Sequence, residues 1–273
     1  MFYSILGNKY REIREYQEGY NDDYTTPDEV AEMKEMDSDE EDYDADISPA
    51  LPKNLKHVPL MHETFPESKM MKRSKEFYNY MNKRRTVRHF SSKPIPIEVI
   101  RNIIMTAGTA PSGAHTEPWT YVVVSDLNIK SQIREITEQE EEINYATRMS
   151  KKWKTDLKPL RTNWIKEYLT EAPYLILVFK QMYSFTEDGQ KKMHYYNEMS
   201  INIAVGMMLA AIHYAGLVSL TSTPLNCGPG LRSLLNRPSS EKLILLLPVG
   251  YPAENCLVPD LSRKTLDEIL VEI

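Results

Sequence analysis

Apolar residues recur along the chain with two periods, and these periods predict its secondary structure. Ile97, Ile100, Ile103 and Ile104 follow a three-to-four residue spacing, which predicts a helix over residues 96–108. The pair Phe77 and Met81 predicts a helix over 74–83, and a more polar helix is expected over 128–150. Runs of β-branched and aromatic residues predict strands over residues 119–124, 174–179, 217–221 and 243–247. This interleaving indicates an α+β fold around one sheet.

Residues 195–215 are predicted to form a helix that is apolar almost all round. Its apolar side chains include Ile201, Ile203, Val205, Met207, Met208, Leu209 and Ile212. A helix without a polar face has to be covered on every side. We therefore expect it either at the centre of the core or in a dimer interface.

Charge divides the chain into a leader and a body. Residues 1–50 hold 16 Asp/Glu and 4 Lys/Arg, whereas residues 51–273 carry a net charge of +6. Such an acidic segment without an apolar period predicts a disordered leader over 1–50, with a partner-docking segment as the alternative. A proline-containing connector over 51–69 is expected to lead into one domain over 70–273. Within that domain, residues 140–170 form a long and irregular connection, which is typical of a substrate lid.

The cysteine content and the length of the apolar stretches indicate where in the cell the protein is expected. The two cysteines and the absence of a glycosylation sequon suit a reducing compartment, and no stretch reaches the roughly 20 apolar residues of a membrane span. We therefore expect a soluble, cytoplasmic protein. The mildly basic body suits a phosphorylated cofactor and is too weakly charged to indicate nucleic-acid binding.

Four segments carry candidate chemistry, and the first two have anion-binding character. A predicted helix end carries Arg84-Arg85-Thr86-Val87-Arg88, which offers three guanidinium groups and a hydroxyl. This segment could bind a phosphate, or it could be a solvated basic helix end. Residues 110–119 contain Pro111, Ser112, Gly113, Ala114 and His115 between a helix and a strand. Their backbone N–H groups could hold an anion, although a plain turn explains the same residues.

The other two segments supply polar side chains. Thr221, Ser222 and Thr223 place three hydroxyls at a strand end, where they could bind a ring nitrogen or only shape a turn. Cys227, near the next predicted helix start, is a weak candidate nucleophile. Glu141 and Tyr145 share one helix face, and Lys166 follows across the long connection. Together they could match the amine and carboxylate of an amino acid, or they could belong to a solvated charged face.

Other site classes are missing from the sequence. There is no dinucleotide fingerprint, no phosphate-binding Walker loop, no hydrolase elbow and no paired Cys-x-x-Cys. The six histidines show no ligand spacing, so no metal site is expected.

The order of these motifs resembles the nitroreductase superfamily, through residues 84–88, 110–115 and 248–252. Within it, residues 109–119, 140–145, 161–168 and 223–228 are similar to the iodotyrosine deiodinase family. The resemblance covers residues 70–273. It implies a three-layer α/β/α fold with a central mixed sheet, in an intertwined homodimer that holds one FMN in each of two active sites at the subunit interface.

The resemblance also implies a role for each site residue. Those expected to bind FMN are Arg84, Arg85, Thr86, Val87, Arg88, Pro111, Ser112, Gly113, Thr221, Ser222, Thr223 and Arg263. Ala114 would donate its backbone N–H to a halotyrosine phenolate, and Glu141, Tyr145 and Lys166 would close over the amino-acid end. Ala114 and Thr223 are the expected catalytic residues, with Thr223 favouring single-electron steps. The implied reaction releases iodide from mono- and diiodotyrosine, with electrons ultimately from NADPH through a separate reductase.

Two departures from the family pattern matter. Thr86 stands where the family commonly has Ser, which keeps the hydroxyl. Animal members usually carry an N-terminal membrane anchor, which this sequence does not show. Two alternatives stay open: a nitro- or quinone reductase of the same fold, against which Glu141, Tyr145 and Lys166 argue, and a non-catalytic flavin-fold interaction protein, which would be colourless.

Overall fold

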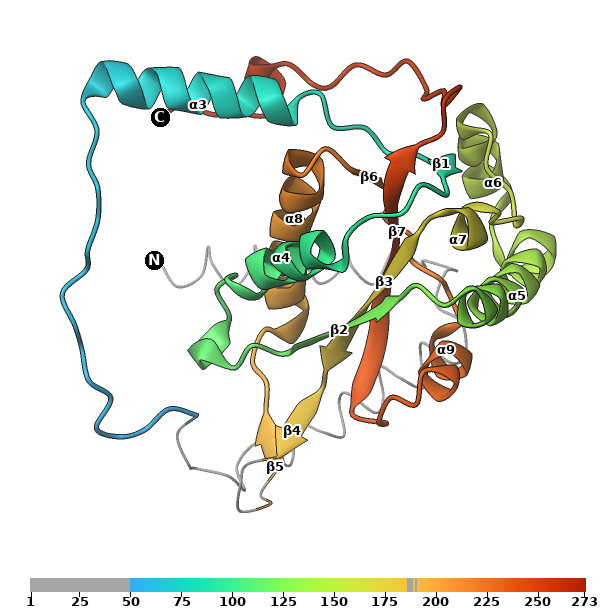
Figure 1. Cartoon of the computed structure of the whole chain (residues 1–273), viewed down its shortest axis with the longest axis horizontal. Coiled ribbons are helices and arrows are strands. Elements are labelled where there is room, and N and C mark those ends of the chain that lie inside the picture. Colours follow the sequence, from blue (N-terminus) through green and yellow to red (C-terminus); the bar gives the residue numbers. More distant parts are fainter. Residues whose placement is uncertain (1–49, 186–188, 190) are drawn as a thin grey trace, which may run out of the picture. The chain divides into compact units, whose positions relative to one another are not determined.

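The computed structural model describes residues 50–185, 189 and 191–273. The predicted acidic leader, apart from residue 50, therefore lies outside the described residues. A five-stranded sheet forms the centre of the fold (Figure 1), with strands in the order β1 (Phe90–Ser91), β7 (Glu241–Pro252), β3 (Tyr174–Gln181) and β2 (Trp119–Val124). The short β6 (Val218–Ser219) also pairs with β7. These ladders are antiparallel and the bridge between Thr86 and Ser219 is parallel, so the sheet is mixed.

The side chains of β3 build two cores, one on each face of the sheet. Leu175, Leu177 and Phe179 pack into one cluster, whereas Ile176 and Val178 pack into the other, as the two-residue period of a strand requires. All five side chains are fully buried, and burial of each contributes about 1.5–3 kcal/mol. Strand β3 therefore lies at the middle of the molecule.

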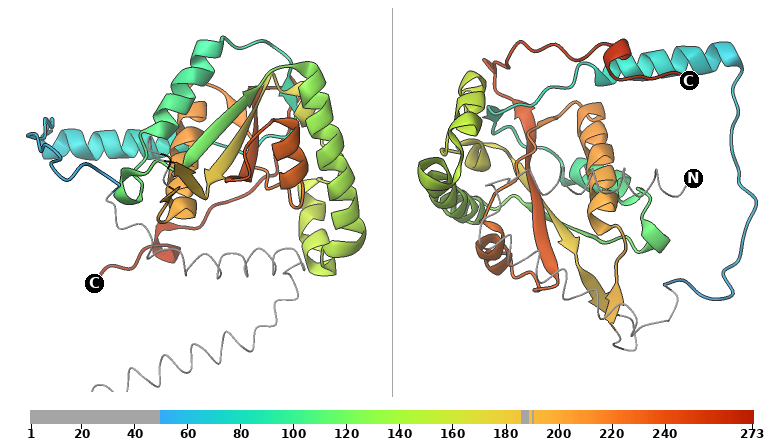
Figure 2. Two further views of the ribbon diagram at one scale, coloured as in Figure 1. Left: turned by 90° about the horizontal axis from the view of Figure 1, so that it is seen from below. Right: turned by 180° about the vertical axis from the view of Figure 1, so that it is seen from behind.

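Helices cover both faces of the sheet and complete three layers. Helices α4 (Ile97–Gly108) and α8 (Asn197–Tyr214) lie on one side, and α5 (Leu127–Ile143), α7 (Tyr168–Glu171) and α9 (Gly228–Leu234) lie on the other (Figures 1 and 2). The predicted α+β fold with an α/β/α arrangement is confirmed. A separate hairpin pairs β4 (Tyr183–Phe185) with β5 (Lys191–Met193).

Most predicted elements are found close to their expected bounds. Helix α4 and strand β2 agree almost residue for residue with the prediction, and α8 lies within the expected 195–215. Strand β7 is longer than the predicted 243–247. The strand expected over 217–221 is interrupted: β6 covers only two residues, and Ser222 then pairs again with Leu246.

Residues 140–170 are mostly helical, so the expectation of an irregular connection was wrong. Helix α5 passes into a π-helical turn, η3 (Asn144–Arg148), followed by α6 (Lys151–Leu157), the 3-10 turn η4 (Lys158–Leu160) and α7. Ser150 caps α6, because its hydroxyl accepts a hydrogen bond from the N–H of Trp153 at 3.1 Å. Arg161 then adopts a left-handed conformation (φ 52°) that ends η4. These capping signals lie in a polar sequence without an apolar period.

Helix α3 (Glu67–Met81) begins earlier than the predicted residue 74, directly after Pro66. None of its residues is buried, and Phe77 is 62% exposed. Helix α8 buries Ile201, Val205 and Met208 in the core but leaves a second apolar face exposed, formed by Met199, Ile203 and Tyr214. Within the described residues, no helix combines the length and apolar character needed to cross a bilayer.

Candidate functional site

The arginine segment Arg84–Arg88 follows the end of α3 at Met81, in agreement with the helix end that the sequence predicts there. Its backbone is fixed by the N–H of Val87, which donates to the carbonyl of Ser219 at 3.1 Å. The Val87 side chain is buried in the core, whereas Arg84, Arg85, Thr86 and Arg88 stay half-buried. The segment therefore presents several donors next to the sheet edge.

Arg263 reaches this segment from the far end of the chain. Its guanidinium donates to the carbonyl of Arg84 at 2.8 Å and to the carbonyl and side chain of Asn82 at 2.9 and 3.0 Å. Burial, the charge of Arg263 and that of Arg85 lower the pKa of Arg84. No carboxylate in the described part of the chain pairs with Arg84, Arg85, Arg88 or Arg263. An anion would relieve this repulsion.

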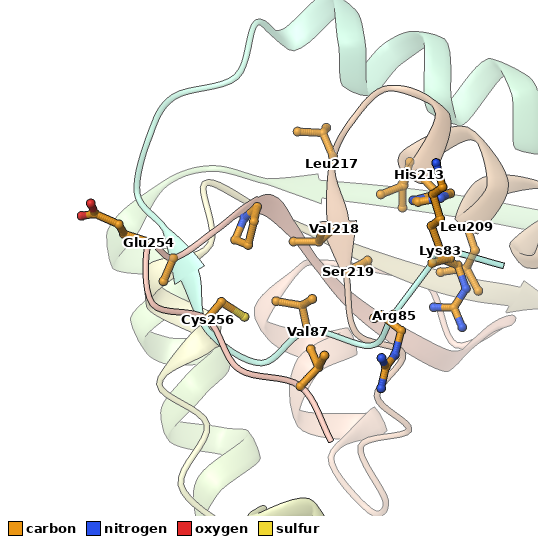
Figure 3. A pocket seen from close by; sticks show the side chains of 15 residues that line it. Lys83, Arg85, Val87, Leu209, His213, Leu217, Val218, Ser219, Glu254 and Cys256 are labelled. Carbon is orange, nitrogen blue, oxygen red and sulfur yellow. The ribbon is translucent and has the colours of Figure 1, made fainter. Parts of the chain in front are cut away.

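A cavity of about 340 Å³ opens beside Arg84 and Arg85. The side chains of Lys83, Arg85 and His213 gather on one side of it, and Glu254 and Cys256 lie on the other (Figure 3). The chain after β7 lines it through residues such as Ala253 and Val258, and Arg85 donates to the carbonyl of the next residue, Pro259. The cavity is thus basic at the end that the arginine segment forms.

The hydroxyl run lies beside the arginine segment. The bridge between Thr86 and Ser219 and the pairing of Ser222 with Leu246 bring residues 219–223 alongside residues 84–88. Thr221 and Thr223 are exposed, and Ser222 is half-buried. Two segments far apart in the sequence therefore form one polar surface.

Glu141, Tyr145 and Lys166 come together as predicted. The Lys166 ammonium lies 3.1 Å from the Glu141 carboxylate and 5.7 Å from the centre of the Tyr145 ring. Their side chains are 8% exposed for Lys166 and 16% for Glu141, so the solvated charged face is excluded for this pair. Burial and the charge of Glu141 raise the pKa of Tyr145, opposed by a hydrogen bond with Thr162 and the charge of Arg88.

This cluster adjoins the arginine and hydroxyl segments. The buried Tyr168 forms a side-chain hydrogen bond with Ser222, and burial raises its pKa. The charge of Arg88 acts on the hydroxyls of both Tyr145 and Tyr168, opposing their pKa shifts. Arg88 therefore lies near enough to both tyrosines for its charge to act on them.

The segment that holds Pro111, Ser112, Gly113 and Ala114 lies elsewhere. It forms the turn η2 (Gly113–His115), on the opposite side of the fold from α5, α6 and α7 in Figures 1 and 2. Ala114 is exposed with a left-handed backbone (φ 49°). A Cβ on Gly113 would lie 2.9 Å from the carbonyl oxygen of Tyr195, which explains the glycine. One chain alone does not bring this turn to the other predicted site residues.

Sequence reasoning missed three polar residues around the cluster. Tyr168 is described above, and Glu138 accepts a hydrogen bond from the backbone N–H of Lys166 at 2.6 Å. Asn144 is 1% exposed, and its side-chain oxygen accepts from Asn226 at 3.2 Å. Only Glu138 left a signal, because it precedes Glu141 by one helical turn on the same face.

Cys227 is not a reactive thiol. It lies at the start of α9, as expected, but it is 1% exposed, and burial together with the charges of Glu141 and Glu140 raises its pKa to about 12. Burial therefore outweighs the effect of the helix start, and the nucleophile hypothesis was wrong. Cys227 and Cys256 are both free.

Known proteins have sequences and structures similar to those of this chain. The family model described as "Nitroreductase family" matches residues 81–251 of this chain. The iodotyrosine deiodinase 1 of Homo sapiens is 60% identical over 230 residues, which cover 84% of this chain and 80% of the relative. The iodotyrosine deiodinase of Nematostella vectensis is 57% identical over 240 residues, 86% of this chain and 91% of the relative.

Solved structures are also similar to the structure of this chain. A crystal structure of oxidised iodotyrosine deiodinase bound to FMN and 3-iodo-L-tyrosine matches with a TM-score of 0.63 and 33% identity, over 72% of this chain and 97% of that one. A BluB-like flavoprotein from Clostridium difficile 630, 21% identical with a TM-score of 0.56 over 72% and 98% of the two chains, shares the fold. The matched family, the identity and its extent together show that this chain belongs to the nitroreductase family and, within it, to the iodotyrosine deiodinases.

Proposed function

We propose that this protein is an FMN-dependent enzyme that reductively removes iodide from mono- and diiodotyrosine. The observation that carries the proposal is the cluster of Glu141, Tyr145 and Lys166 beside Arg88 and Ser222. It joins a site for an amino-acid zwitterion to a site with the character of a flavin pocket. The relatives' names and the FMN and 3-iodo-L-tyrosine bound in the matched deiodinase structure support this substrate and cofactor.

The residues present fit FMN. Arg84 and Arg263 are neighbouring cations without a carboxylate partner in the described part of the chain, and a phosphate dianion would neutralise both. Arg85 and Arg88 add further donors, and the hydroxyls of Thr86, Thr221, Ser222 and Thr223 lie along the same polar surface. When bound, FMN would supply the two electrons that the reaction needs.

The substrate's charged end fits the acidic and basic pair. A carboxylate such as Glu141 binds an α-ammonium group, and Lys166 binds an α-carboxylate. Both side chains are mostly buried, so these contacts would form with little water around them. A simple aromatic nitro compound or quinone has no charged end to use them.

The reaction requires bond breaking at the ring carbon. The carbon–iodine bond breaks, iodide leaves as an anion, and the carbon gains a hydrogen at the cost of two electrons and one proton. In this proposal the backbone N–H of Ala114 holds the phenolate oxygen, and its exposed left-handed turn leaves that group accessible. The Thr223 hydroxyl would lie against the flavin ring.

A second copy of the chain completes the site in this proposal. The turn with Pro111, Ser112, Gly113 and Ala114 lies away from the cluster of its own chain, so a partner would have to supply it. The exposed apolar face of α8, with Met199, Ile203 and Tyr214, supports an intertwined homodimer. As the resemblance to the family implies, the electrons would come ultimately from NADPH through a separate reductase. Residues 70–273 would form the catalytic domain, after a leader and a connector.

Anaerobic titration tests the function. Protein loaded with FMN and reduced with dithionite should be reoxidised by 3,5-diiodotyrosine, with release of iodide, as followed by the flavin absorbance. Tyrosine, which keeps the zwitterion but has no iodine, is the matched control and should leave the reduced spectrum unchanged. Reoxidation without iodide release, or a purified protein that binds no FMN, would contradict the proposal.

A further inference from the structure

One face of α5 carries a row of polar side chains that all contact residues 163–172. Lys130 donates to the carbonyl of Ala172 at 2.8 Å, and Arg134 donates to the Thr170 hydroxyl at 3.1 Å. Glu138 and Glu141 continue the row one turn apart. Both contact Lys166, so the segment that carries Lys166 is fastened to α5 along its length.

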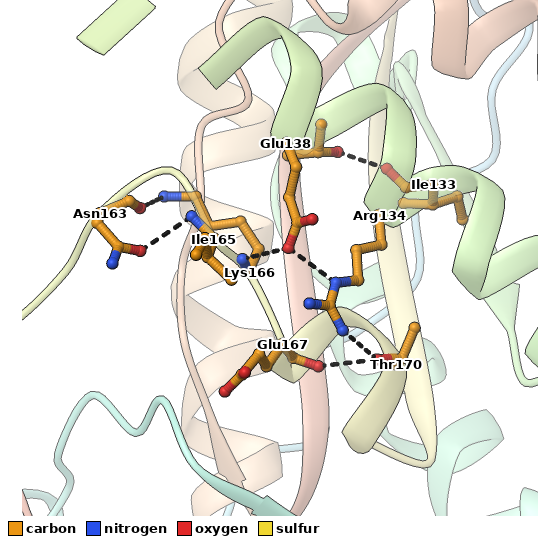
Figure 4. Close-up of polar contacts among 9 residues, drawn as sticks. Ile133, Arg134, Glu138, Asn163, Ile165, Lys166, Glu167 and Thr170 are labelled. Carbon is orange, nitrogen blue, oxygen red and sulfur yellow. Dashed lines mark hydrogen bonds and ion pairs between the residues drawn. The ribbon is translucent and has the colours of Figure 1, made fainter. Parts of the chain in front are cut away.

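Glu138 holds Lys166 by its main chain. Its Oε1 atom accepts the backbone N–H of Lys166 at 2.6 Å and the Nε–H of Arg134 at 2.7 Å (Figure 4). The ammonium of the same lysine lies 3.1 Å from Glu141. Two carboxylates of one helix therefore hold the two nitrogen atoms of one residue, at either end of its flexible side chain.

Arg134 and Thr170 extend the same contact. The guanidinium that orients Glu138 also binds the Thr170 hydroxyl, which donates to the carbonyl of Glu167 at 3.0 Å (Figure 4). Arg134 thus restricts Glu138 to the position from which it reaches Lys166. Among the residues that the structure describes, the exposed i,i+4 pair Lys152 and Asp156 has no contact of this kind with a distant segment.

We infer that Glu138 is a positioning residue that sets the place of the Lys166 ammonium and so governs affinity for the amino-acid end of the substrate. This inference rests on the proposed function. In this inference Glu138 acts through Lys166, whose backbone N–H it holds with the same Oε1 atom that accepts from Arg134. Without Glu138, Lys166 keeps its charge but its backbone is no longer held in place. Its long side chain then loses more conformational entropy when it binds substrate.

Direct binding tests the inference. FMN-loaded Glu138→Ala, titrated with 3-iodotyrosine and followed by the flavin absorbance, should show a Kd raised by about tenfold or more. Its Kd for 2-iodophenol, which lacks the charged end, should stay at the wild-type value. Glu135→Ala is the matched control, because Glu135 is an exposed glutamate on the same helix, and it should leave both values unchanged. Glu138→Gln keeps an acceptor oxygen and should recover part of the affinity.

A double-mutant cycle separates positioning from general stability. If Glu138 acts through Lys166, adding Glu138→Ala to Lys166→Met should weaken 3-iodotyrosine binding no further than Lys166→Met alone. Additive losses, or equal losses for 3-iodotyrosine and 2-iodophenol, would overturn the inference. If Glu138→Ala fails to fold or to hold FMN, Glu138→Gln carries the same comparison.

The proposed function can fail separately. A wild-type protein that holds FMN but binds no 3-iodotyrosine would overturn the function, and this inference with it. Wild-type binding with an unchanged Kd in Glu138→Ala would overturn the inference alone.

Discussion

The Lys166 ammonium and the Glu141 carboxylate lie 3.1 Å apart, and the ammonium also donates to the backbone carbonyl of Asn163. These are the two groups proposed to take opposite ends of the substrate's zwitterion. Because both are largely buried, neither could stay charged at low cost without a partner. The pair keeps the site neutral before substrate arrives, and the substrate's own charges can then replace each partner in turn.

Removing one of these charges should therefore affect amino-acid substrates selectively. Lys166→Met keeps the side-chain volume but removes the ammonium. We expect its Kd for 3-iodotyrosine to rise by about 10- to 150-fold, the loss of one hydrogen bond to a charged group. Its Kd for 2-iodophenol should stay unchanged, as measured by flavin absorbance. An equal rise for both ligands would show that Lys166 only supports the fold.

Arg84 should contribute to FMN binding. Arg84→Ala should weaken FMN binding by about 1.5–3 kcal/mol, because a charge-assisted contact with the phosphate is lost. The FMN that remains after dialysis measures this effect. Arg101→Ala is the control, since Arg101 is an exposed arginine that pairs only with Glu98 among the described residues. Wild-type FMN retention in Arg84→Ala would contradict the assignment.

Much of the fold could be predicted from local pattern alone. Helix α4 has a strong apolar period, because one of its faces is buried, and β3 is a continuous apolar run, because both of its faces are buried. Helix α6 and the turn η4, over residues 151–160, could not be predicted, since their stability comes from a cap such as Ser150 and from polar contacts rather than from a buried apolar stripe. Periodicity carries no signal for elements of that kind.

The candidate site also contains residues that could be predicted from the sequence and residues that could not. The grouping of Glu141, Tyr145 and Lys166 was predicted from helix spacing and side-chain chemistry, the resemblance added their role, and the contacts show that the three side chains lie together. The roles of Tyr168 and Asn144 were not predicted, because their partners Ser222 and Asn226 lie far away in sequence. The chemistry of Cys227 was misjudged, since a sequence shows its helix start but not its burial.

Within the lid expected over residues 140–170, substrate should order residues 145–162. Helix α6 contacts Tyr145 through Lys154, within this same segment, whereas residues 163–170 are already fastened to α5 by Arg134 and Glu138. Amide hydrogen exchange over 145–162 should slow when 3-iodotyrosine binds and should not slow with 2-iodophenol. Residues 163–170 should be protected throughout. Equal protection of 145–162 by both ligands would show that the charged end does not close the lid.

The exposed apolar face of α8 should be the centre of the dimer. Ile203 is 48% exposed on that face, and Ile203→Glu would place a charge in the interface. We expect its dimer Kd, from sedimentation at submicromolar concentrations, to rise by at least about 30-fold, with loss of FMN. Leu127→Glu is the control, because Leu127 is similarly exposed but lies at the start of α5. A folded, FMN-loaded wild-type monomer would refute the dimer.

Thr223 should decide which reduction the enzyme performs. Reductive cleavage of an aryl–iodine bond is easier in single-electron steps than by hydride attack on an electron-rich phenol, and a hydrogen bond to the flavin ring is one way that a protein tunes this choice. Thr223 is exposed at the end of the hydroxyl run, on the surface that residues 84–88 share. Thr223→Ala should keep FMN and bind 3-iodotyrosine with the wild-type Kd, yet lose most deiodination, while its reduction of a nitroarene by hydride transfer stays or increases. Thr223→Ser restores the hydroxyl and should restore iodide release. If Thr223→Ala releases iodide at the wild-type rate, its hydroxyl serves only the turn before Pro224.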